Sequence, residues 1–196
     1  MGELMLQVRR VASLEVIGAA PARRGFAVAT FTLLTALGAQ VSVPIGPVPV
    51  SLQTLFVSLA GLLLGARLGA YSQLAYLALG AAGLPVFAQG AGLGYLLGPT
   101  GGYLLAFPVA AAFTGWFAQR FGSIGGVRGA VVLGIGTLLG TGFVFLGGWS
   151  QLTALTGDPG RAFLVGVAPF LAGDVLKVVL AVLLAARLRR RMLRLL

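Results

Sequence analysis

Residues 83–103 read GLPVFAQGAGLGYLLGPTGGY, an uncharged stretch in which glycine recurs at seven positions and proline at two. Glycine lets the backbone turn with positive φ, and proline removes an N–H donor, so the stretch cannot be ordinary helix interior. It lies between long apolar segments, and lipid cannot satisfy its freed backbone groups. Its many leucine, valine, phenylalanine and tyrosine residues would be superfluous in a solvated connector. We therefore predict a folded lid or pocket wall at a membrane edge.

Composition places the rest of the chain in a membrane. Of the 196 residues, 58% are hydrophobic and 9% are charged, whereas about a quarter are charged in a typical soluble domain. The sequence has no cysteine and no histidine, and its four carboxylates are Glu3, Glu15, Asp158 and Asp174. This inventory lacks the commonest general base and the thiolate and imidazole metal ligands. We therefore predict no enzyme, no metal site and no cofactor.

Apolar segments separated by proline, glycine and arginine set the expected architecture. A helix needs about 20 apolar residues to cross the hydrocarbon core, and the second segment is somewhat short for this. The predicted fold class is an all-α integral membrane protein with six transmembrane helices and structured external loops, forming a single membrane domain over residues 1–196. The predicted helices span approximately 25–43, 51–66, 68–84, 102–119, 129–149 and 163–188.

Three shorter segments carry more specific signals. The three prolines within 44–49 exclude helix there. Gly157-Asp158-Pro159 predicts a helix start, with Asp158 as the N-cap and Pro159 at the first helical position. The last pass then either runs from Pro159 with a break at Pro169 or begins afresh near Pro169. Residues 1–22 fit a short interfacial helix or a loose tail.

Arginine placement predicts the orientation. With six passes and the N-terminus in the cytoplasm, every Lys and Arg falls in a cytoplasmic segment except Arg161 and Lys177. This is the asymmetry that the positive-inside rule describes, so we predict both termini in the cytoplasm. The net charge of +10 then needs no nucleic acid partner, and the basic C-terminal tail is expected to lie beside anionic membrane lipid.

The last apolar segment contains the sequence PFLAGDVLKVVLA, with Asp174 and Lys177 three residues apart on one helix face. Ionisable groups at this depth are costly and usually face a cavity or pathway. The pair is either a ligand-gripping site or a structural ion pair between helices. Other polar groups, including Gln53, Tyr76 and Gln89, are individually more typical of interhelical hydrogen bonds.

Small residues spaced four apart along the first apolar pass permit close helix approach. The pairs are Gly25/Ala29, Thr32/Ala36 and Thr35/Ala39. Internal packing explains such pairs equally well, so spacing alone does not assign them.

Four motifs carry a family resemblance: VPVSLQT, GLPVF, GPTGGYLLAF and PFLAGDVLK, in this order. Together they resemble the biotin-specific substrate-binding (S) components of energy-coupling factor (ECF) transporters, the BioY family. The resemblance covers about residues 25–188. It implies six transmembrane helices in the cell membrane of a prokaryote, an outward pocket for biotin, a transmembrane coupling (T) component and two ATPase subunits.

The resemblance also implies site residues. Asp174 and Lys177 match the D-x-x-K expected to grip the biotin head group, and Gln53 matches the glutamine after the first external loop. Further substrate-binding positions implied in this way are Tyr76, Phe87, Gln89, Thr100, Gly101, Gly102 and Tyr103. The partner contact is expected on the first helix at Gly25, Ala29, Thr32, Thr35, Ala36 and Ala39. Gln89 stands in a glycine-rich loop without arginine or lysine, so no cation for the biotin carboxylate is evident there.

Two alternatives to a vitamin-binding subunit remain at the level of sequence. One is a self-sufficient porter or channel that uses Asp174 and Lys177 as a proton relay. The other is an assembly protein in which the pair is structural. Proton relays usually need several titratable groups, and the apolar segments offer one acid. Lys177 is not preceded by a G-x-x-x-x-G loop, so the chain lacks the P-loop route to ATP hydrolysis.

Overall fold

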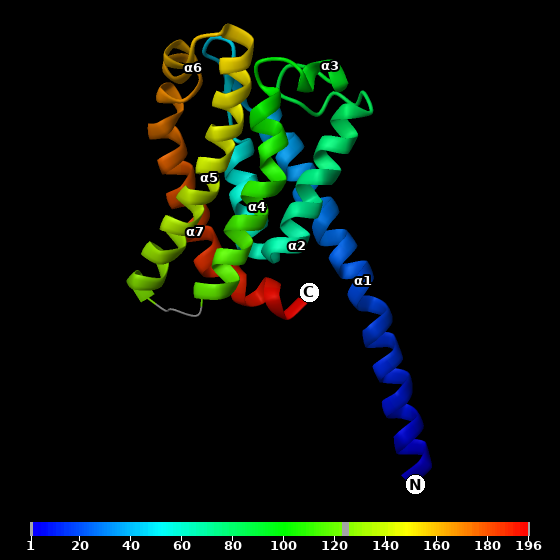
Figure 1. Cartoon of the computed structure of the whole chain (residues 1–196). Coiled ribbons are helices and arrows are strands. Elements are labelled where there is room, and N and C mark those ends of the chain that lie inside the picture. The colour runs from blue at the N-terminus through cyan, green and yellow to red at the C-terminus, as the bar shows by residue number, and fades with distance from the viewer. Residues whose placement is uncertain (1, 123–125, 196) are drawn as a thin grey trace.

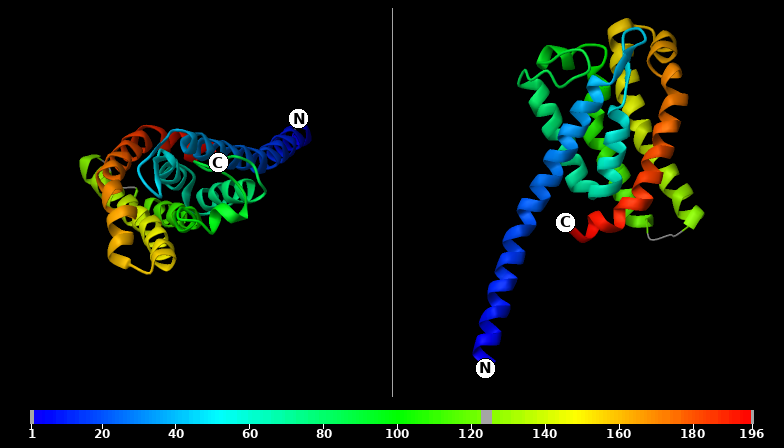
Figure 2. Two further views of the ribbon diagram at one scale, coloured as in Figure 1. Left: turned by 90° about the horizontal axis from the view of Figure 1, so that it is seen from above. Right: turned by 180° about the vertical axis from the view of Figure 1, so that it is seen from behind.

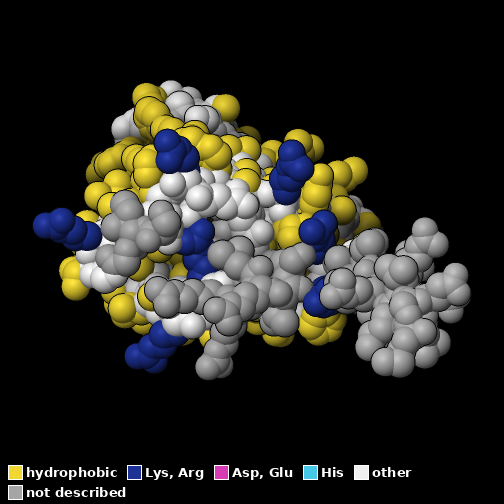
Figure 3. Space-filling model, turned by 90° about the horizontal axis from the view of Figure 1, so that it is seen from below, with side chains coloured by type: hydrophobic (Ala, Val, Ile, Leu, Met, Phe, Trp, Pro, Cys, Tyr) yellow, Lys and Arg dark blue, Asp and Glu magenta, His cyan; other side chains and the backbone are white. Residues whose placement is uncertain are grey.

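A computed structural model describes the backbone of residues 2–122 and 126–195, with side chains for 21–122, 126–189 and 192. Helices dominate, and long helices run side by side in a bundle with the short elements at one end (Figure 1). We call the end that carries the β-hairpin and residues 82–100 the loop end. We call the opposite end the arginine end, because Lys and Arg side chains lie on it (Figure 3).

The first helix, α1 (Gly2–Gln40), is longer than predicted at its N-terminal side. Residues 2–20 continue the same helix past Pro21, and this part projects away from the bundle (Figure 2). The prediction of a separate interfacial helix or a loose tail is therefore wrong for the backbone of this part. Its side chains lie outside the described residues. Near Pro21, Ala19, Ala20 and Ala22 are strong helix formers, which explains the continuity.

A two-stranded hairpin follows α1. Strand β1 (Ser42–Pro44) pairs with β2 (Pro49–Ser51), and Val43 lies opposite Val50. Val43 precedes a proline, which favours extended backbone and ends the helix earlier than predicted. Gly46 turns the loop with φ of 102°. The Leu52 N–H donates to the Gly38 carbonyl at 3.1 Å, which ties the hairpin to the end of α1.

Helix α2 (Gln53–Ala81) consists of two limbs joined at Gly65, whose φ of 81° and ψ of −177° are not helical. The limbs run antiparallel, as Figure 1 shows. The first limb, 53–64, is only about 18 Å long, shorter than the ~30 Å hydrocarbon core. A Cβ at Gly69 would lie 3.1 Å from the Ala60 carbonyl oxygen, so the two limbs touch through their backbones.

The remaining helices complete the bundle. They are α3 (Leu93–Leu96), α4 (Gly101–Phe121), α5 (Gly126–Thr156), α6 (Pro159–Gly166), the 3₁₀ turn η1 (Ala168–Phe170) and α7 (Leu171–Leu195). Asp158 caps α6 by accepting the Arg161 N–H at 2.9 Å, with Pro159 at the first helical position, so the predicted helix start is confirmed. The final pass runs from Pro159 and is broken around Val167–Phe170.

Close backbone contacts join α4 to its neighbours. A Cβ at Gly61 would lie 2.6 Å from the Ala111 carbonyl oxygen of α4, and one at Gly147 would lie 2.5 Å from the Gly102 carbonyl oxygen. Such small residues let helices approach without a hydrophobic drive from lipid. Between α1 and α2, Thr32 Oγ1 donates to the Ser72 carbonyl at 2.9 Å, and Gln73 Nε2 donates to Thr35 Oγ1 at 3.2 Å. Polar groups therefore join α1 to the bundle.

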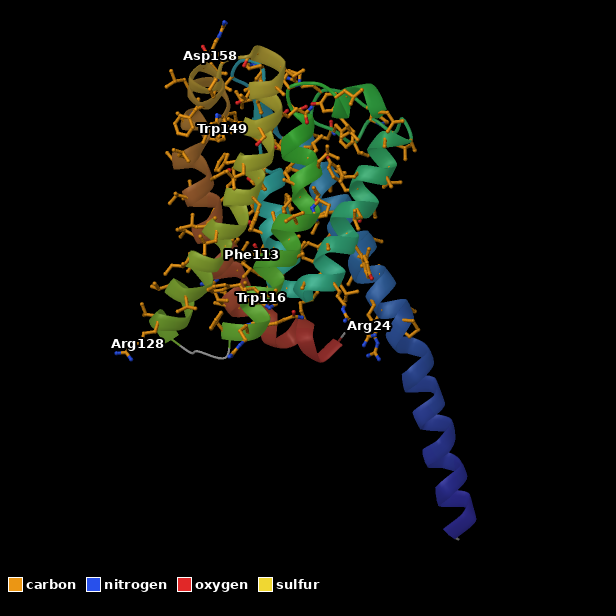
Figure 4. The ribbon with its side chains drawn as sticks, viewed as in Figure 1. Arg24, Phe113, Trp116, Arg128, Trp149 and Asp158 are labelled. Carbon is orange, nitrogen blue, oxygen red and sulfur yellow. The ribbon has the colours of Figure 1, made fainter. Side chains whose placement is uncertain are left out.

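The described helices are apolar enough for a membrane. Four segments meet the length and hydropathy of a membrane span: Gln53–Ala81, Gly101–Phe121, Gly126–Thr156 and Pro159–Arg189. Large apolar side chains point outward along them, as at Leu139 and Leu183. Trp149 lies toward the loop end and Trp116 toward the arginine end (Figure 4), where interfacial tryptophans are common. The prediction of an α-helical integral membrane protein is confirmed.

Candidate ligand-binding site

A cavity opens inside the bundle toward the loop end, with about 530 Å³ of atom-free space counted to its open side. The hairpin, the start of α2, the glycine-rich stretch, α4, α5, η1 and α7 all contribute to its wall. The lining residues are Val48, Pro49, Ser51, Gln53, Thr54, Ala88, Tyr95, Thr100, Tyr103, Leu104, Phe107, Val144, Phe145, Phe170, Asp174 and Lys177. The wall is mostly apolar with a few convergent polar groups, which is typical of small-molecule sites.

The charged pair of the cavity is bridged by a hydroxyl from another helix. Lys177 Nζ lies 2.5 Å from Asp174 Oδ1 and donates to Thr54 Oγ1 at 3.1 Å. Thr54 Oγ1 in turn donates to Asp174 Oδ1 at 2.9 Å. Asp174 and Lys177 are 4% and 9% exposed, so each charge compensates the burial of the other. The triad joins the first limb of α2 to α7. Along α7, Asp174 lies about 22 Å from Arg189.

Residual hydrogen-bonding capacity remains in this triad. An ammonium carries three donors, and the structure assigns two of the Lys177 bonds to Asp174 and Thr54. Both bonds described for the Asp174 carboxylate end on Oδ1. A ligand entering the cavity therefore meets a carboxylate oxygen able to accept and an ammonium able to donate.

Behind the cavity, a chain of hydrogen bonds leads from the hairpin to the glycine-rich stretch. Ser51 Oγ donates to Gln53 Oε1 at 2.8 Å, and Gln53 Nε2 donates to the Tyr76 hydroxyl at 2.7 Å. The Tyr76 hydroxyl donates to the Val86 carbonyl at 3.1 Å. Gln53 lines the cavity, whereas Tyr76 is fully buried outside the lining and orients Gln53.

The glycine-rich stretch is folded, as its apolar residues indicate. The Phe87 ring packs over Gly80, where a Cβ would collide with it, and lies edge-on to Tyr76 at 5.5 Å between ring centroids. The Gly92 N–H donates to the Gly80 carbonyl at 2.7 Å. The glycine-rich stretch contributes four residues to the cavity wall and so forms part of the pocket: Ala88, Tyr95, Thr100 and Tyr103.

Tyr103 fixes the place where the final pass is broken. Its hydroxyl donates to the Gly166 carbonyl at 2.7 Å, and its ring covers Gly148 of α5, where a Cβ would overlap the ring. The break that follows Gly166 brings Phe170 into the cavity wall one turn before Asp174. Tyr103 thus positions the start of α7 relative to α4.

Four other residues predicted for the site do not line the cavity. Gln89 is exposed and outside the lining, and Phe87 packs behind Tyr76 rather than on the cavity. Gly101 and Gly102 are buried in close contacts with the Leu96 and Gly147 carbonyls. Lining residues that the sequence did not single out include Thr54, Phe107, Val144 and Phe170. Thr54 follows Gln53 directly in the VPVSLQT motif, which is the signal that was available.

The small-residue pairs of α1 divide between two faces. Thr32, Thr35 and Ala39 are buried against the bundle, and Ala36 is half-buried. Gly25 and Ala29 are exposed. Only the Gly25/Ala29 pair therefore presents both members on the outside of α1.

A helical bundle with long apolar spans and an ion pair buried in an internal cavity defines an integral membrane protein built to hold a small ligand. The chain belongs to the BioY family, whose family model matches residues 10–194.

Individual relatives agree with this assignment. The chain is 45% identical over 163 residues to a protein named "Probable biotin transporter BioY" from Pyrococcus horikoshii, covering 83% of this chain and 93% of that one. It is 40% identical over 161 residues to "Biotin transporter BioY" from Thermotoga maritima, covering 82% and 92%. Among solved structures, the S-component for biotin from an ECF-type ABC transporter matches with a TM-score of 0.80 and 30% identity, covering 87% of this chain and 92% of that chain.

Proposed function

We propose that the chain is the biotin-binding membrane subunit, the S component, of an ATP-driven ECF importer. The observation that carries the proposal is the buried triad of Asp174, Lys177 and Thr54 in a cavity of a fold similar to the S-component for biotin. The names of the relatives, biotin transporters, support transport rather than catalysis. In a dry site, hydrogen bonds to these charges are stronger than in water.

The ureido ring of biotin has two N–H donors and one carbonyl acceptor. Asp174 Oδ2 accepts from one ring N–H group, and the third Lys177 donor reaches the adjacent carbonyl. Apolar walls for the bicycle come from Phe107, Val144 and Phe170. The acid tail points toward Thr100, at the N-terminal end of α4, where the helix dipole favours a negative charge. In the opposite arrangement, Lys177 binds the carboxylate of the biotin tail and Gln53 forms hydrogen bonds with the ureido ring.

The remaining parts of the importer lie outside this chain. The sequence has no P-loop, and the ECF type implies that the energy comes from two ATPase subunits joined through a transmembrane T component. The six-pass topology has both limbs of α2 as passes and the arginine end in the cytoplasm. Figure 4 supports this orientation, because Arg24 and Arg128 lie at one end and Asp158 at the other. The cavity then opens to the outside of a prokaryotic cell membrane.

Isothermal titration calorimetry on the purified chain tests the proposal. We expect biotin to bind, and Asp174→Asn to weaken binding roughly 10–100-fold, because a hydrogen bond to a charged group contributes about 1.5–3 kcal/mol. Asp158→Asn is the matched control: it makes the same change at an exposed helix cap, where asparagine serves equally well. Absence of biotin binding by a folded wild-type chain would refute the function.

Biotin with an amidated tail decides between the two ligand arrangements in the same titrations. If Lys177 holds the ureido carbonyl, amidation costs little, and Lys177→Ala weakens the acid and the amide alike. If amidation alone abolishes binding and Lys177→Ala no longer distinguishes acid from amide, Lys177 holds the carboxylate.

A further inference from the structure

A second concave site lies at the arginine end, between α1 and the last turns of α7. We call it the α1–α7 groove. It is lined by Ala22, Arg23, Phe26, Ala27, Thr30, Phe31 and Met192, with about 1110 Å³ of atom-free space counted to its open side. It shares no lining residue with the ligand cavity.

The groove is built by the way α7 ends. Arg189 Nη1 donates to the Gly122 carbonyl at 3.0 Å, and Nη2 donates to the Ala118 carbonyl. These bonds fix the last turns of α7 against the C-terminus of α4, where a guanidinium is favoured by the helix dipole. Met192, three residues later, then packs on the core beside α1 and forms the far wall.

Chemically, the groove has two parts. Along α1, Phe26, Ala27 and Phe31 give an apolar wall, and Thr30 turns its hydroxyl to the Phe26 carbonyl of its own helix at 2.8 Å. Arg23 stands at the other end, about 12 Å along the helix from Phe31. A cation followed by an apolar channel matches a charged head group followed by an acyl chain.

The charge of the surrounding surface decides which head group fits. On the described part of the arginine end, Figure 3 shows Lys and Arg side chains among apolar ones and no acidic side chain. The described acids are elsewhere, Asp158 at the loop end and Asp174 in the cavity. Basic pockets between helices at the cytoplasmic face favour anionic lipid head groups. The five donors of a guanidinium let Arg23 bind a phosphate alongside another neighbour.

We propose that the α1–α7 groove is a binding site for one anionic phospholipid, with its phosphate at Arg23 and an acyl chain along Phe26, Ala27 and Phe31. The site does not depend on biotin binding. It adjoins the exposed Gly25/Ala29 pair of α1, so the lipid lies beside the surface proposed for the T component.

Native mass spectrometry of the purified full chain tests this proposal. The probes are dioleoyl phosphatidylglycerol and dioleoyl phosphatidylcholine, supplied together in equal amounts. We expect roughly fivefold more adducts with phosphatidylglycerol, the effect of one arginine near an anionic head group. Arg23→Gln brings the two lipids to parity. Arg128→Gln, an exposed arginine on the opposite side of the same end (Figure 4), keeps the preference.

A second variant tests the acyl channel. Ala22→Trp fills the groove and is expected to reduce adducts of both lipids, with a thermal unfolding curve that confirms the fold. Equal retention of both lipids by the wild type would overturn the proposal. Equal losses of the preference for phosphatidylglycerol in Arg23→Gln and Arg128→Gln would also overturn it. So would wild-type dimers that carry no lipid and that disappear in Ala22→Trp.

Discussion

At the scale of single residues, the hydroxyl of Thr54 connects the two charged groups of the cavity. It donates to Asp174 and accepts from Lys177, so it fixes both side chains from a helix distant in sequence. Replacing Thr54 with valine keeps the shape and removes these bonds. We expect Thr54→Val to weaken biotin binding roughly tenfold or more, the lower range for a hydrogen bond to a charge. Calorimetric titration measures the change.

Thr54→Ser is the matched control, because it keeps the hydroxyl and removes only a methyl group. Its affinity is expected to stay close to that of the wild type. Wild-type affinity in Thr54→Val would mean that Asp174 and Lys177 hold their positions without the bridge.

At the scale of elements, α4 packs against its neighbours at positions that lack side chains. A Cβ at Gly115 would overlap the backbone of Gly65 and Ala66, at the turn between the limbs of α2. We expect Gly115→Val to destabilise the fold by about 1–3 kcal/mol, the usual cost of overpacking, or to prevent folding. Gly134→Val on α5 is the control, since its Cβ meets nothing within 4 Å. Thermal unfolding in detergent compares the two variants, and equal stability would contradict the close contact.

The α1 helix supplies another prediction at this scale. Ala29 is exposed beside Gly25, and a tryptophan there would hold a second helix away. We expect Ala29→Trp to leave biotin affinity unchanged and to abolish ATP-dependent biotin uptake by cells that contain the T component and ATPases. Val131→Trp, at an exposed position of α5, serves as the control and keeps uptake. Unchanged uptake in Ala29→Trp would place the partner contact elsewhere.

At the scale of the whole molecule, local sequence signals predict most of the fold. Long uncharged segments predict α4 and α5, and Asp158 with Pro159 predicts the start of α6, because each signal lies within the element it defines. The N-terminal extension of α1 is missed, since the uncharged segment begins only after Arg23 and Arg24, whereas the helix runs through these arginines and past Pro21. The short first limb of α2 is stabilised by contacts with α4 that a local pattern does not contain.

In the candidate site too, some residues carry a local sequence signal and others are recognised only in the folded structure. Asp174 and Lys177 are visible in sequence because charges in an apolar segment are rare. Thr54 carries only its position beside Gln53 in VPVSLQT as a signal, because its partner Asp174 lies 120 residues away and only folding brings them together. Gln89 is the reverse case: it lies in the stretch that forms part of the pocket, yet it is exposed and outside the cavity lining.

The glycine contacts of α4 bear on how the molecule deforms. Where backbone meets backbone, as at Gly61 with Ala111 and Gly102 with Gly147, no rotamer can change to absorb a displacement. We therefore expect the two limbs of α2 to move with α4 and α5 as one rigid unit. α1 and α7 pack on this unit through polar bonds and through apolar side chains such as Phe31, Val178 and Val182. Because side chains can change rotamer where backbones cannot, we expect the molecule to deform more easily at these two outer helices, and one of them carries Asp174 and Lys177.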